Sequence, residues 1–289
     1  MNTPASPAVN TVAVVGLGLI GGSFARDIRT AGFADRILGV DNNSQHAARA
    51  RELQLVDATA SLADAANQAD LTIIAVPVDA AEKLLPQVLD SIGPHQTVTD
   101  VCSTKATLLN AVHQHPRRDR FVAGHPMAGT EHSGPDAALS GLFHDKVGII
   151  CNREESAPGA VALIEQLYRA LGMRIEYLDG QRHDMHVAFV SHVSHAISYA
   201  LALTVLEKER DERQIFNLAS GGFSSTARLA KSSASMWTPI FLANRDNVLS
   251  VLDTYLEKLS ELRTAIEDND SQTLNSLIAA ANDIRRVLQ

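Results

Sequence analysis

Cysteine and positive charge are both scarce in this chain of 289 residues. The two cysteines, Cys102 and Cys151, lie far apart and in no metal-ligand spacing, so we expect no disulfide framework, no metal and a reducing, cytoplasmic location. The first ten residues hold no basic cluster and no apolar run, which argues against a signal peptide. The apolar stretch Thr11–Ala25 is interrupted by glycines and is too short to cross a bilayer, so we expect no membrane association.

The charge balance is acidic, with 25 lysines and arginines against 33 aspartates and glutamates and a formal net charge of −8. Such a chain repels nucleic-acid backbones and anionic lipid, so we expect neither as a partner. An anionic small molecule is still compatible, because a few cationic side chains can outweigh the global field inside a cleft. Hydrophobic residues make up 45% and charged residues 20%, which is typical of a globular chain with one large domain or two ordinary ones.

Short apolar runs alternate with amphipathic stretches along the first part of the chain. Strands are predicted at Val12–Val15, Ile37–Val40, Leu71–Val76, Thr97–Val101, Phe121–Ala123, Val147–Cys151 and Arg174–Tyr177. Helices are predicted at Gly22–Ala31, Ala47–Leu53, Asp79–Leu89 and Gly159–Leu171. Strands that alternate with helices predict an α/β fold, a Rossmann-type and mostly parallel sheet with helices on both faces.

Helical periodicity replaces the strand pattern after Asp179. His183–Glu209 reads as one long apolar helix, and a second helical stretch ends where Asn269-Asp270-Ser271 breaks and recaps the chain. We therefore expect a Rossmann-type α/β domain at residues 1–179 and an all-helical domain at residues 180–289. A helix as apolar as His183–Glu209 needs burial, which a homodimer through the C-terminal helices would supply; packing within its own subunit is the alternative.

A glycine-rich turn follows the first predicted strand. Gly16, Gly18 and Gly21, with Leu19 and Ile20 between the last two, match the G-x-G-x-x-G pattern of dinucleotide-binding proteins. The first glycine permits the tight turn, the second lets the backbone approach a diphosphate, and the third lets helix and strand pack closely. The free N–H groups of the following helix would then meet the diphosphate.

An acidic residue and a second strand end strengthen this interpretation. Asp41 ends the second predicted strand, where its carboxylate can bind both ribose hydroxyls of NAD and would repel the 2′-phosphate of NADP. Val76 and Pro77, at the end of the third predicted strand, complete the expected cofactor site. We therefore expect NAD as the cofactor, although a glycine turn with an incidental surface aspartate, or another adenine ligand such as FAD, would give the same pattern.

A histidine lies in a second glycine-rich segment, Gly124–Gly134. His125 follows the predicted strand Phe121–Ala123, at the edge of a parallel sheet where ligands usually bind. An imidazole there can accept the proton of a substrate hydroxyl as hydride leaves the same carbon. Ser103 follows the neighbouring strand and is expected near the same cleft. The alternative for His125 alone is a turn residue that hydrogen-bonds only to the backbone.

Several segments together resemble the prephenate/arogenate dehydrogenase family of tyrosine biosynthesis. They are VGLGLIGGS, DVCSTK, GHPMAGTEHSG, SHVSHAIS and GGFSSTARLAKSSASMW, which occur in the family's order between about Thr11 and about Lys258. The resemblance implies that residues 1–179 form an NAD-binding Rossmann domain and that residues 180–289 form a helical substrate and dimerisation domain. It also implies NAD-dependent oxidative decarboxylation of prephenate, of arogenate or of both.

The resemblance also implies roles for individual residues. His125 would take the proton of the ring hydroxyl, and Ser103 would orient His125 and contact the same hydroxyl. Arg228 would hold a substrate carboxylate with its guanidinium fork, although the sequence alone also allows a surface helix arginine. Trp237, Gly222 and His195 would line the substrate pocket, with His195 in contact with the substrate. The partner subunit could supply Gly222, and core packing is the alternative role for Trp237.

His192 and His195 lie three residues apart on one predicted helix, downstream of His183 and His186. Their spacing is not that of a zinc helix, and no glutamate base or cysteine ligand is near, so no metal is expected. The resemblance instead implies that His195 contacts substrate and that His192 is a buried histidine with satisfied hydrogen bonds.

The residues that follow His125 bear on substrate choice without deciding it. Glu131 and His132 fall where the family contacts the substrate side chain. A cationic His132 would favour the pyruvyl group of prephenate, whereas Glu131 could pair with the ammonium group of arogenate. Other functions also stay open, namely a β-hydroxyacid dehydrogenase or imine reductase of related architecture, or a non-catalytic NAD-binding protein.

Overall fold

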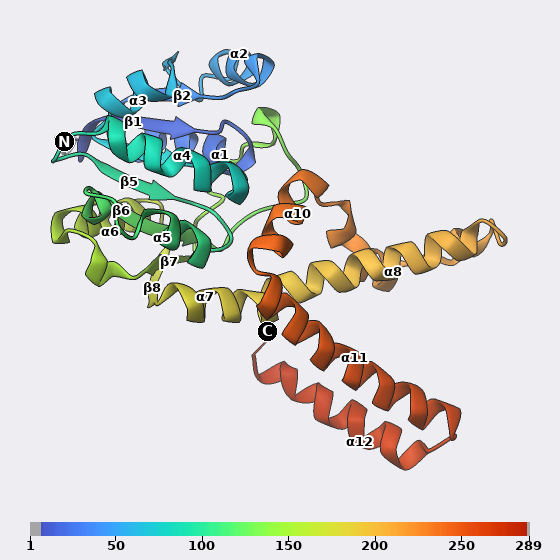
Figure 1. Ribbon diagram of the computed structural model, residues 1–289. Coiled ribbons are helices and arrows are strands. Elements are labelled where there is room, and N and C mark those ends of the chain that lie inside the picture. Colours follow the sequence, from blue (N-terminus) through green and yellow to red (C-terminus); the bar gives the residue numbers. More distant parts are fainter. Residues whose placement is uncertain (1–6, 288–289) are drawn as a thin grey trace, which may run out of the picture. The chain divides into compact units, whose positions relative to one another are not determined.

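The computed structural model describes residues 7–287, and its first compact unit is built around one eight-stranded sheet (Figure 1). The strand order is β3-β2-β1-β4-β5-β6-β7-β8, and neighbours run parallel except at β6–β7. The predicted Rossmann-type, mostly parallel sheet is thereby confirmed. The strands are β1 (Val9–Val15), β2 (Ala34–Val40), β3 (Ala58–Thr59), β4 (Leu71–Ile74), β5 (Thr97–Asp100), β6 (Phe121–Pro126), β7 (Val147–Cys151) and β8 (Arg174–Leu178).

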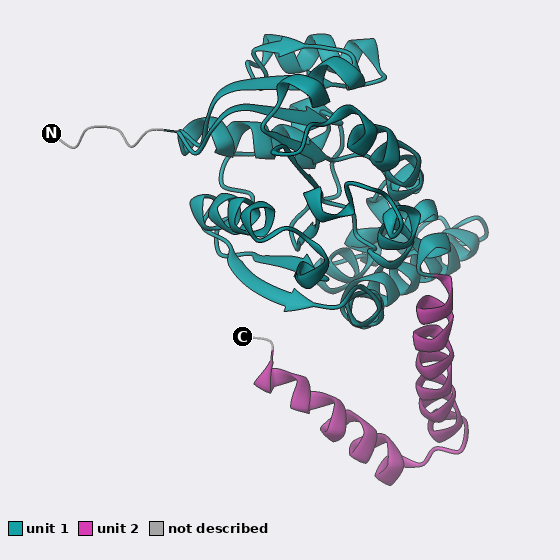
Figure 2. Ribbon diagram, turned by 60° about the vertical axis from the view of Figure 1, so that its left-hand side comes forward, with its two compact units in different colours: residues 1–244 teal, residues 245–289 magenta. Residues whose placement is uncertain are grey.

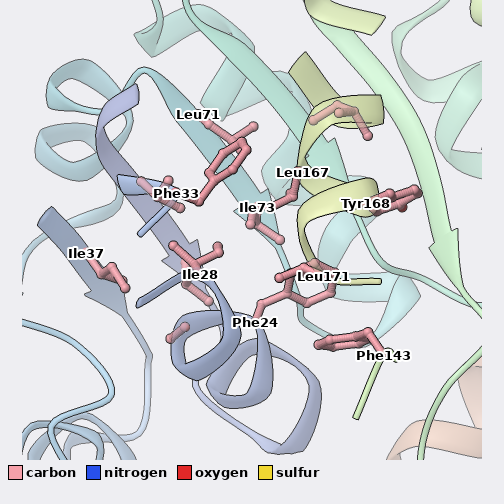
Figure 3. Close-up of a cluster of buried hydrophobic side chains, with 14 of the residues drawn as sticks. Phe24, Ile28, Phe33, Ile37, Leu71, Ile73, Phe143, Leu167, Tyr168 and Leu171 are labelled. Atoms are coloured by element: carbon pink, nitrogen blue, oxygen red, sulfur yellow. The ribbon is translucent and has the colours of Figure 1, made fainter. Parts of the chain in front are cut away.

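Helices cover this sheet and bury its apolar side chains in separate clusters. The connecting helices are α1 (Leu19–Thr30), α2 (Ser44–Glu52), α3 (Leu62–Gln68), α4 (Val78–Ser91), α5 (Ala106–Val112) and α6 (Pro158–Ala170). Ile73 packs with residues of α1 and α6 such as Phe24 and Leu167, part of the cluster drawn in Figure 3. Its neighbour Ile74 packs with Leu85 of α4 in another cluster. Successive side chains of a strand point to opposite faces, so β4 is apolar throughout because both faces are covered.

The helical part of the first unit follows β8. It comprises α7 (Gly180–Val187), a single π turn (Ala188–His192), α8 (Val193–Glu209), α9 (Gly221–Ala227) and α10 (Ala234–Ala243). The predicted helix His183–Glu209 is thus present, interrupted once by the π turn, and such turns often occur at functional sites. Along α8, only Val193 and Ser198 are buried within the chain. By length and apolarity alone the run Gly180–Glu209 would suit a bilayer, a weak criterion that helices of soluble proteins also meet.

A second compact unit begins at Arg245 (Figure 2). Its helices are α11 (Arg245–Glu267) and α12 (Ser271–Ala281). The break predicted between them is present: Asn269 has a positive φ of 52°, and the Asp270 carboxylate accepts the N–H groups of Gln272 and Thr273. The domain boundary expected near residue 180 lies within the first unit, between β8 and α7, and stays a prediction.

Candidate active site

The glycine turn between β1 and α1 is shaped by backbone packing. A Cβ atom on Gly21 would lie 1.9 Å from the carbonyl oxygen of Gly16, so no larger residue fits there. Gly16 itself has a φ of +94°, and its Cβ atom would lie 2.3 Å from the carbonyl oxygen of Ala75. At Gly18, by contrast, the nearest atom to a Cβ is the backbone nitrogen of Gly134 at 4.0 Å, which leaves space above the turn.

The other positions predicted to bind the cofactor surround this turn. No side chain caps the N-terminus of α1, so the N–H groups at Leu19 and Ile20 point from an uncapped positive helix end. Asp41 follows β2, and its Oδ2 accepts the backbone N–H of Leu17 at 2.8 Å, so the carboxylate also anchors the turn. Val76 and Pro77 follow β4, the strand that pairs with β1 on its other side. These positions therefore meet at the carboxyl ends of adjacent strands.

His125 lies within a strand and not in a loop. The sequence predicts that the strand ends at Ala123, but β6 continues to Pro126 because β7 pairs with it antiparallel, placing His125 opposite Ile149. The side chain of His125 is buried, with 8% of the residue exposed. Gly124 and Pro126, the residues before and after His125, are also paired with β7. This pairing fixes the direction of the imidazole more firmly than a glycine-rich loop would.

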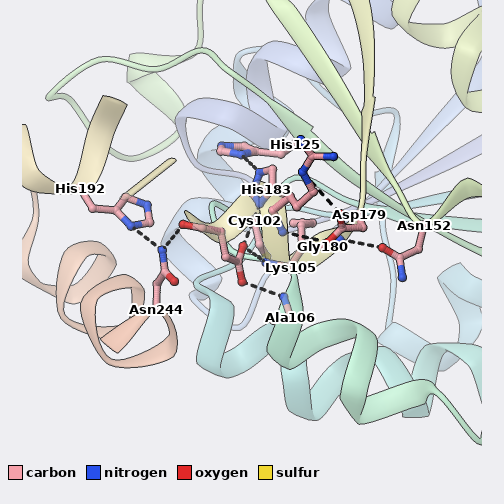
Figure 4. Close-up of polar contacts among 12 residues, drawn as sticks. Cys102, Lys105, Ala106, His125, Asn152, Asp179, Gly180, His183, His192 and Asn244 are labelled. Atoms are coloured by element: carbon pink, nitrogen blue, oxygen red, sulfur yellow. Dashed lines mark hydrogen bonds and ion pairs between the residues drawn. The ribbon is translucent and has the colours of Figure 1, made fainter. Parts of the chain in front are cut away.

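A chain of hydrogen bonds leads away from His125 into α7 (Figure 4). Nδ1 of His125 is 2.8 Å from Nε2 of His183, and Nδ1 of His183 is 2.8 Å from Oδ1 of Asp184. The Asp184 carboxylate also accepts the backbone N–H groups of Lys105 at 2.7 Å and Ala106 at 2.9 Å, where α5 begins. From the sequence alone, His183 has no predicted role, and Asp184 is not among the predicted site residues.

Burial keeps these imidazoles neutral. Desolvation lowers the pKa of His125 well below its ordinary value, and the neighbouring charges of His183 and Lys105 act in the same direction. Desolvation also lowers the pKa of His183, against the opposing hydrogen bond to Asp184. On the π turn, burial lowers the pKa of His192 to about 4. A neutral imidazole can accept a proton, which is what a general base at this position requires.

The buried ion pair between Lys105 and Asp100 holds the backbone next to His125. Nζ of Lys105 contacts the Asp100 carboxylate and donates to the carbonyl oxygen of Gly124 at 2.7 Å. The other Asp100 oxygen accepts the N–H of Gly124 at 3.1 Å, so the residue before His125 is held at both its polar backbone groups. Burial alone would lower the pKa of Lys105, but the charge and hydrogen bond of Asp100, together with the neighbouring Cys102 and Cys151, outweigh it and raise that pKa.

The depressed histidine pKa values predict a loss of stability in mild acid. In the unfolded chain these imidazoles bind protons below a pKa of about 6.5, whereas the folded protein resists their protonation. Because the unfolded chain binds more protons, the free energy of unfolding should fall by up to about 1.4 kcal/mol per pH unit for each such histidine as pH drops from about 6.5 to its folded pKa, which is about 4 for His192.

Urea unfolding at pH 7.5 and pH 5.0 measures this effect. Replacing His192, His192→Asn, should reduce the difference between the two midpoints, and replacing the exposed His144, His144→Asn, should leave it unchanged. Equal stability of the unmodified protein at both pH values would contradict the prediction.

The predicted substrate contacts form two pairs. Nη1 of Arg228, which begins the short 3₁₀ turn after α9, is 3.2 Å from Oε2 of Glu131. His195 stacks on Trp237 with ring centroids 3.5 Å apart, and its Nδ1 lies 3.1 Å from the carbonyl oxygen of Ser191. Trp237 is buried, but its Nε1 has no hydrogen-bond partner within residues 7–287, so packing alone does not satisfy it.

The other predicted substrate contacts are exposed or half-buried. His132 and Gly222 are exposed, and Ser103 is half-buried between β5 and α5. Within the described residues the imidazole of His125 is in hydrogen-bond contact with His183 and not with Ser103, so the role of Ser103 stays a prediction. His192 is only half satisfied, because Nδ1 meets the Asn244 amide at 3.1 Å while Nε2 has no partner in the described chain.

Residues 24–177 match the family model "Prephenate dehydrogenase, nucleotide-binding domain". The chain belongs to the prephenate dehydrogenase family. Residues 179–280 match a second model of the family, "Prephenate dehydrogenase, dimerization domain".

Named members of the prephenate dehydrogenase family are similar over most of the chain. The cyclohexadienyl dehydrogenase of Zymomonas mobilis is 33% identical over 91% of this chain and 90% of its own length. The prephenate dehydrogenase of Bacillus subtilis is 32% identical over 96% of this chain and 75% of its own length. The crystal structure of prephenate dehydrogenase from A. aeolicus in complex with hydroxyphenyl propionate and NAD+ superposes with a TM-score of 0.85, at 29% identity, covering 96% of this chain and 98% of that one.

Proposed function

We propose that the protein catalyses the NAD-dependent oxidative decarboxylation of prephenate, in which His125 accepts the proton of the ring hydroxyl. The observation that carries the proposal is the buried, neutral His125 at the carboxyl end of β6, in the sheet whose β1 end carries the glycine turn. Membership of the prephenate dehydrogenase family supports the same reaction. The β-hydroxyacid dehydrogenase, imine reductase and non-catalytic alternatives have no comparable support.

The residues around the glycine turn fit NAD. The turn leaves space above Gly18, the uncapped end of α1 supplies N–H groups for a diphosphate, and the Asp41 carboxylate lies at the end of β2, where ribose hydroxyls bind. A 2′-phosphate would meet the negative charge of Asp41, so NAD is favoured over NADP. When bound, the nicotinamide supplies the hydride acceptor.

The side chains of this protein then have separate tasks. His125 takes the proton of the substrate hydroxyl as hydride leaves the same carbon, and it returns that proton to the ring oxygen after CO₂ has left. Arg228 binds a substrate carboxylate through its guanidinium group. His195 and Trp237, which stack on each other, line the substrate, with His132, Gly222 and the hydroxyl of Ser103 as further contacts.

Glu131 is the residue that bears on the choice between prephenate and arogenate. Its carboxylate is already paired with Arg228, at 3.2 Å, and this pairing favours a substrate without an ammonium group. Steady-state kinetics with prephenate and with arogenate, each with NAD and with NADP, test the proposal. We expect the largest kcat/KM with prephenate and NAD; a much larger value with arogenate would overturn the substrate preference, and no turnover with either substrate would overturn the function.

Replacing Arg228 by lysine, Arg228→Lys, should raise the KM for prephenate by about 10- to 100-fold with a smaller effect on kcat. Lysine keeps the charge but loses the two-pronged hydrogen bonding that a guanidinium offers a carboxylate. The equivalent change at an exposed arginine, Arg263→Lys, is the control and should leave KM unchanged. An unchanged KM in Arg228→Lys would remove Arg228 from substrate binding.

We also propose a cytoplasmic homodimer assembled through the C-terminal helices. The family model matched by residues 179–280 is a dimerization domain, and α8 carries apolar side chains that the single chain leaves open, such as Leu203, 67% exposed, and Leu206, 48% exposed. A second copy of this chain would cover them. Sedimentation of the purified protein tests this proposal, because a monomer at micromolar concentration would contradict it.

A further inference from the structure

The proposed function uses His125 but leaves His183 and Asp184 without a task, although they form one hydrogen-bonded chain with it. The chain runs from β6 to α7, and the imidazole of His183 and the carboxylate of Asp184 are both almost completely buried, with 0% and 3% of their side chains exposed. A buried polar chain of this kind is costly unless every member is satisfied. Here each internal nitrogen and oxygen has a partner.

The Asp184 carboxylate can only accept hydrogen bonds, and this fixes the direction of each hydrogen bond in the chain of residues. Asp184 faces three donors, the two backbone N–H groups at the start of α5 and Nδ1 of His183. Nδ1 of His183 must therefore carry its proton, which leaves the lone pair of a neutral His183 on Nε2. Since Nε2 of His183 accepts, Nδ1 of His125 donates, at 2.8 Å. The lone pair of His125 is then on Nε2, the nitrogen that no described residue occupies.

We propose that His183 and Asp184 are positioning residues for His125 that fix its reactive tautomer, and that His183 takes up the Nδ1 proton of His125 as His125 accepts the substrate proton at Nε2. The inference rests on the proposed function, in which His125 is the base. The O–H bond of the substrate breaks and an N–H bond forms at Nε2 of His125. At the same time the Nδ1–H bond of His125 breaks and an N–H bond forms at Nε2 of His183.

The positive charge then lies on His183, beside the Asp184 carboxylate, and not on His125. The hydride goes to the nicotinamide of NAD, and the electron pair of the bond to the departing carboxylate enters the ring as CO₂ leaves. The proton returns along the same two bonds to the ring oxygen, so the chain of residues ends each turnover as it began. No oxidant other than NAD is needed.

The other charged and titratable groups near the two imidazoles also favour the positive charge on His183. Lys105 and His192 both act against a positive charge on His125. His183 also faces Lys105, but Asp184 and Asp100 oppose its effect there. A cation is therefore better accommodated on His183 than on His125.

Two variants of His183 separate positioning from a purely structural role. Glutamine, His183→Gln, can accept from Nδ1 of His125 through its amide oxygen and so keeps the tautomer, but it cannot receive a proton. Phenylalanine, His183→Phe, fills the space and can do neither. His186, three residues along α7 with no side-chain hydrogen bond in the described chain, gives matched controls in His186→Gln and His186→Phe.

The measurement is kcat/KM for prephenate as a function of pH, with NAD binding measured separately. We expect kcat to fall by about 10-fold in His183→Gln and by about 100-fold or more in His183→Phe. In both variants the acidic limb should move to lower pH, because the proton loses the site beside Asp184. The His186 variants should change neither the rate nor the limb.

The possible outcomes are distinguishable from failure of the proposed function. If the unmodified protein turns over prephenate but both His183 variants keep its acidic limb, the proton stays on His125 and the inference is wrong. Equal rates in His183→Gln and His183→Phe would show that the tautomer does not depend on an acceptor at this position. Lack of turnover in the unmodified protein would instead overturn the function itself.

Discussion

Asparagine in place of His125, His125→Asn, is expected to lower kcat by about 100- to 10,000-fold while NAD still binds. Asparagine can donate to Nε2 of His183 and so can keep the buried hydrogen bond, but it cannot accept a proton at neutral pH. The glycine turn and Asp41, which hold the cofactor in this account, lie on β1 and β2, whereas His125 lies on β6. The rate and the cofactor affinity should therefore respond separately.

Stopped-flow turnover and a fluorescence titration with NADH measure the two quantities. The same substitution at the exposed His144, His144→Asn, is the control and should leave both unchanged. Unchanged turnover in His125→Asn would show that another group takes the proton, and a parallel loss of NADH binding would show that the substitution acts on the fold.

Removal of the Lys105 charge, Lys105→Met, is expected to lower the free energy of unfolding by about 3–5 kcal/mol. Lys105 and Asp100 are 0% and 1% exposed, so methionine would leave an unpaired carboxylate in a dry environment. It would also remove the donor to the carbonyl oxygen of Gly124, the residue before His125. Activity should consequently fall further than the folded fraction alone explains.

Urea unfolding of the purified variant measures the change, with Lys258→Met as the control. Lys258 pairs with Glu261 on the surface of α11, where solvent screens the charges, so its removal should leave the unfolding midpoint unchanged. A loss below about 1 kcal/mol in Lys105→Met would contradict a stabilising role for the buried pair.

The sequence allowed the sheet and its main helices to be predicted because their burial patterns are strong and local. The strand Val147–Cys151 was predicted with its observed bounds, and β4 was recognisable because covering both faces makes it apolar throughout. The strand β3 has only two residues, Ala58–Thr59, and too short a pattern to recognise. The helix α5 was missed because Asp184, 79 residues beyond Lys105, supplies the acceptor at its start.

The candidate site was predicted only where its residues belong to a local sequence motif. The glycine turn is a local motif, so its residues could be named from the sequence, whereas the second role of Asp41, as the acceptor for Leu17, depends on how the turn folds back. His183 contacts His125 across 58 residues of sequence, and no spacing rule predicts that contact. The adjacent His183-Asp184 pair was the one available signal, because a carboxylate beside a histidine often fixes its tautomer.

The most direct test of the central claim is the stoichiometry of a single reaction mixture of protein, prephenate and NAD. NADH is followed by absorbance, and released CO₂ is trapped and counted from carboxyl-labelled substrate. We expect one NADH and one CO₂ for each prephenate consumed, with both signals strongly reduced in His125→Asn. NADH formed without CO₂, or CO₂ released without NADH, would contradict an oxidative decarboxylation at this site.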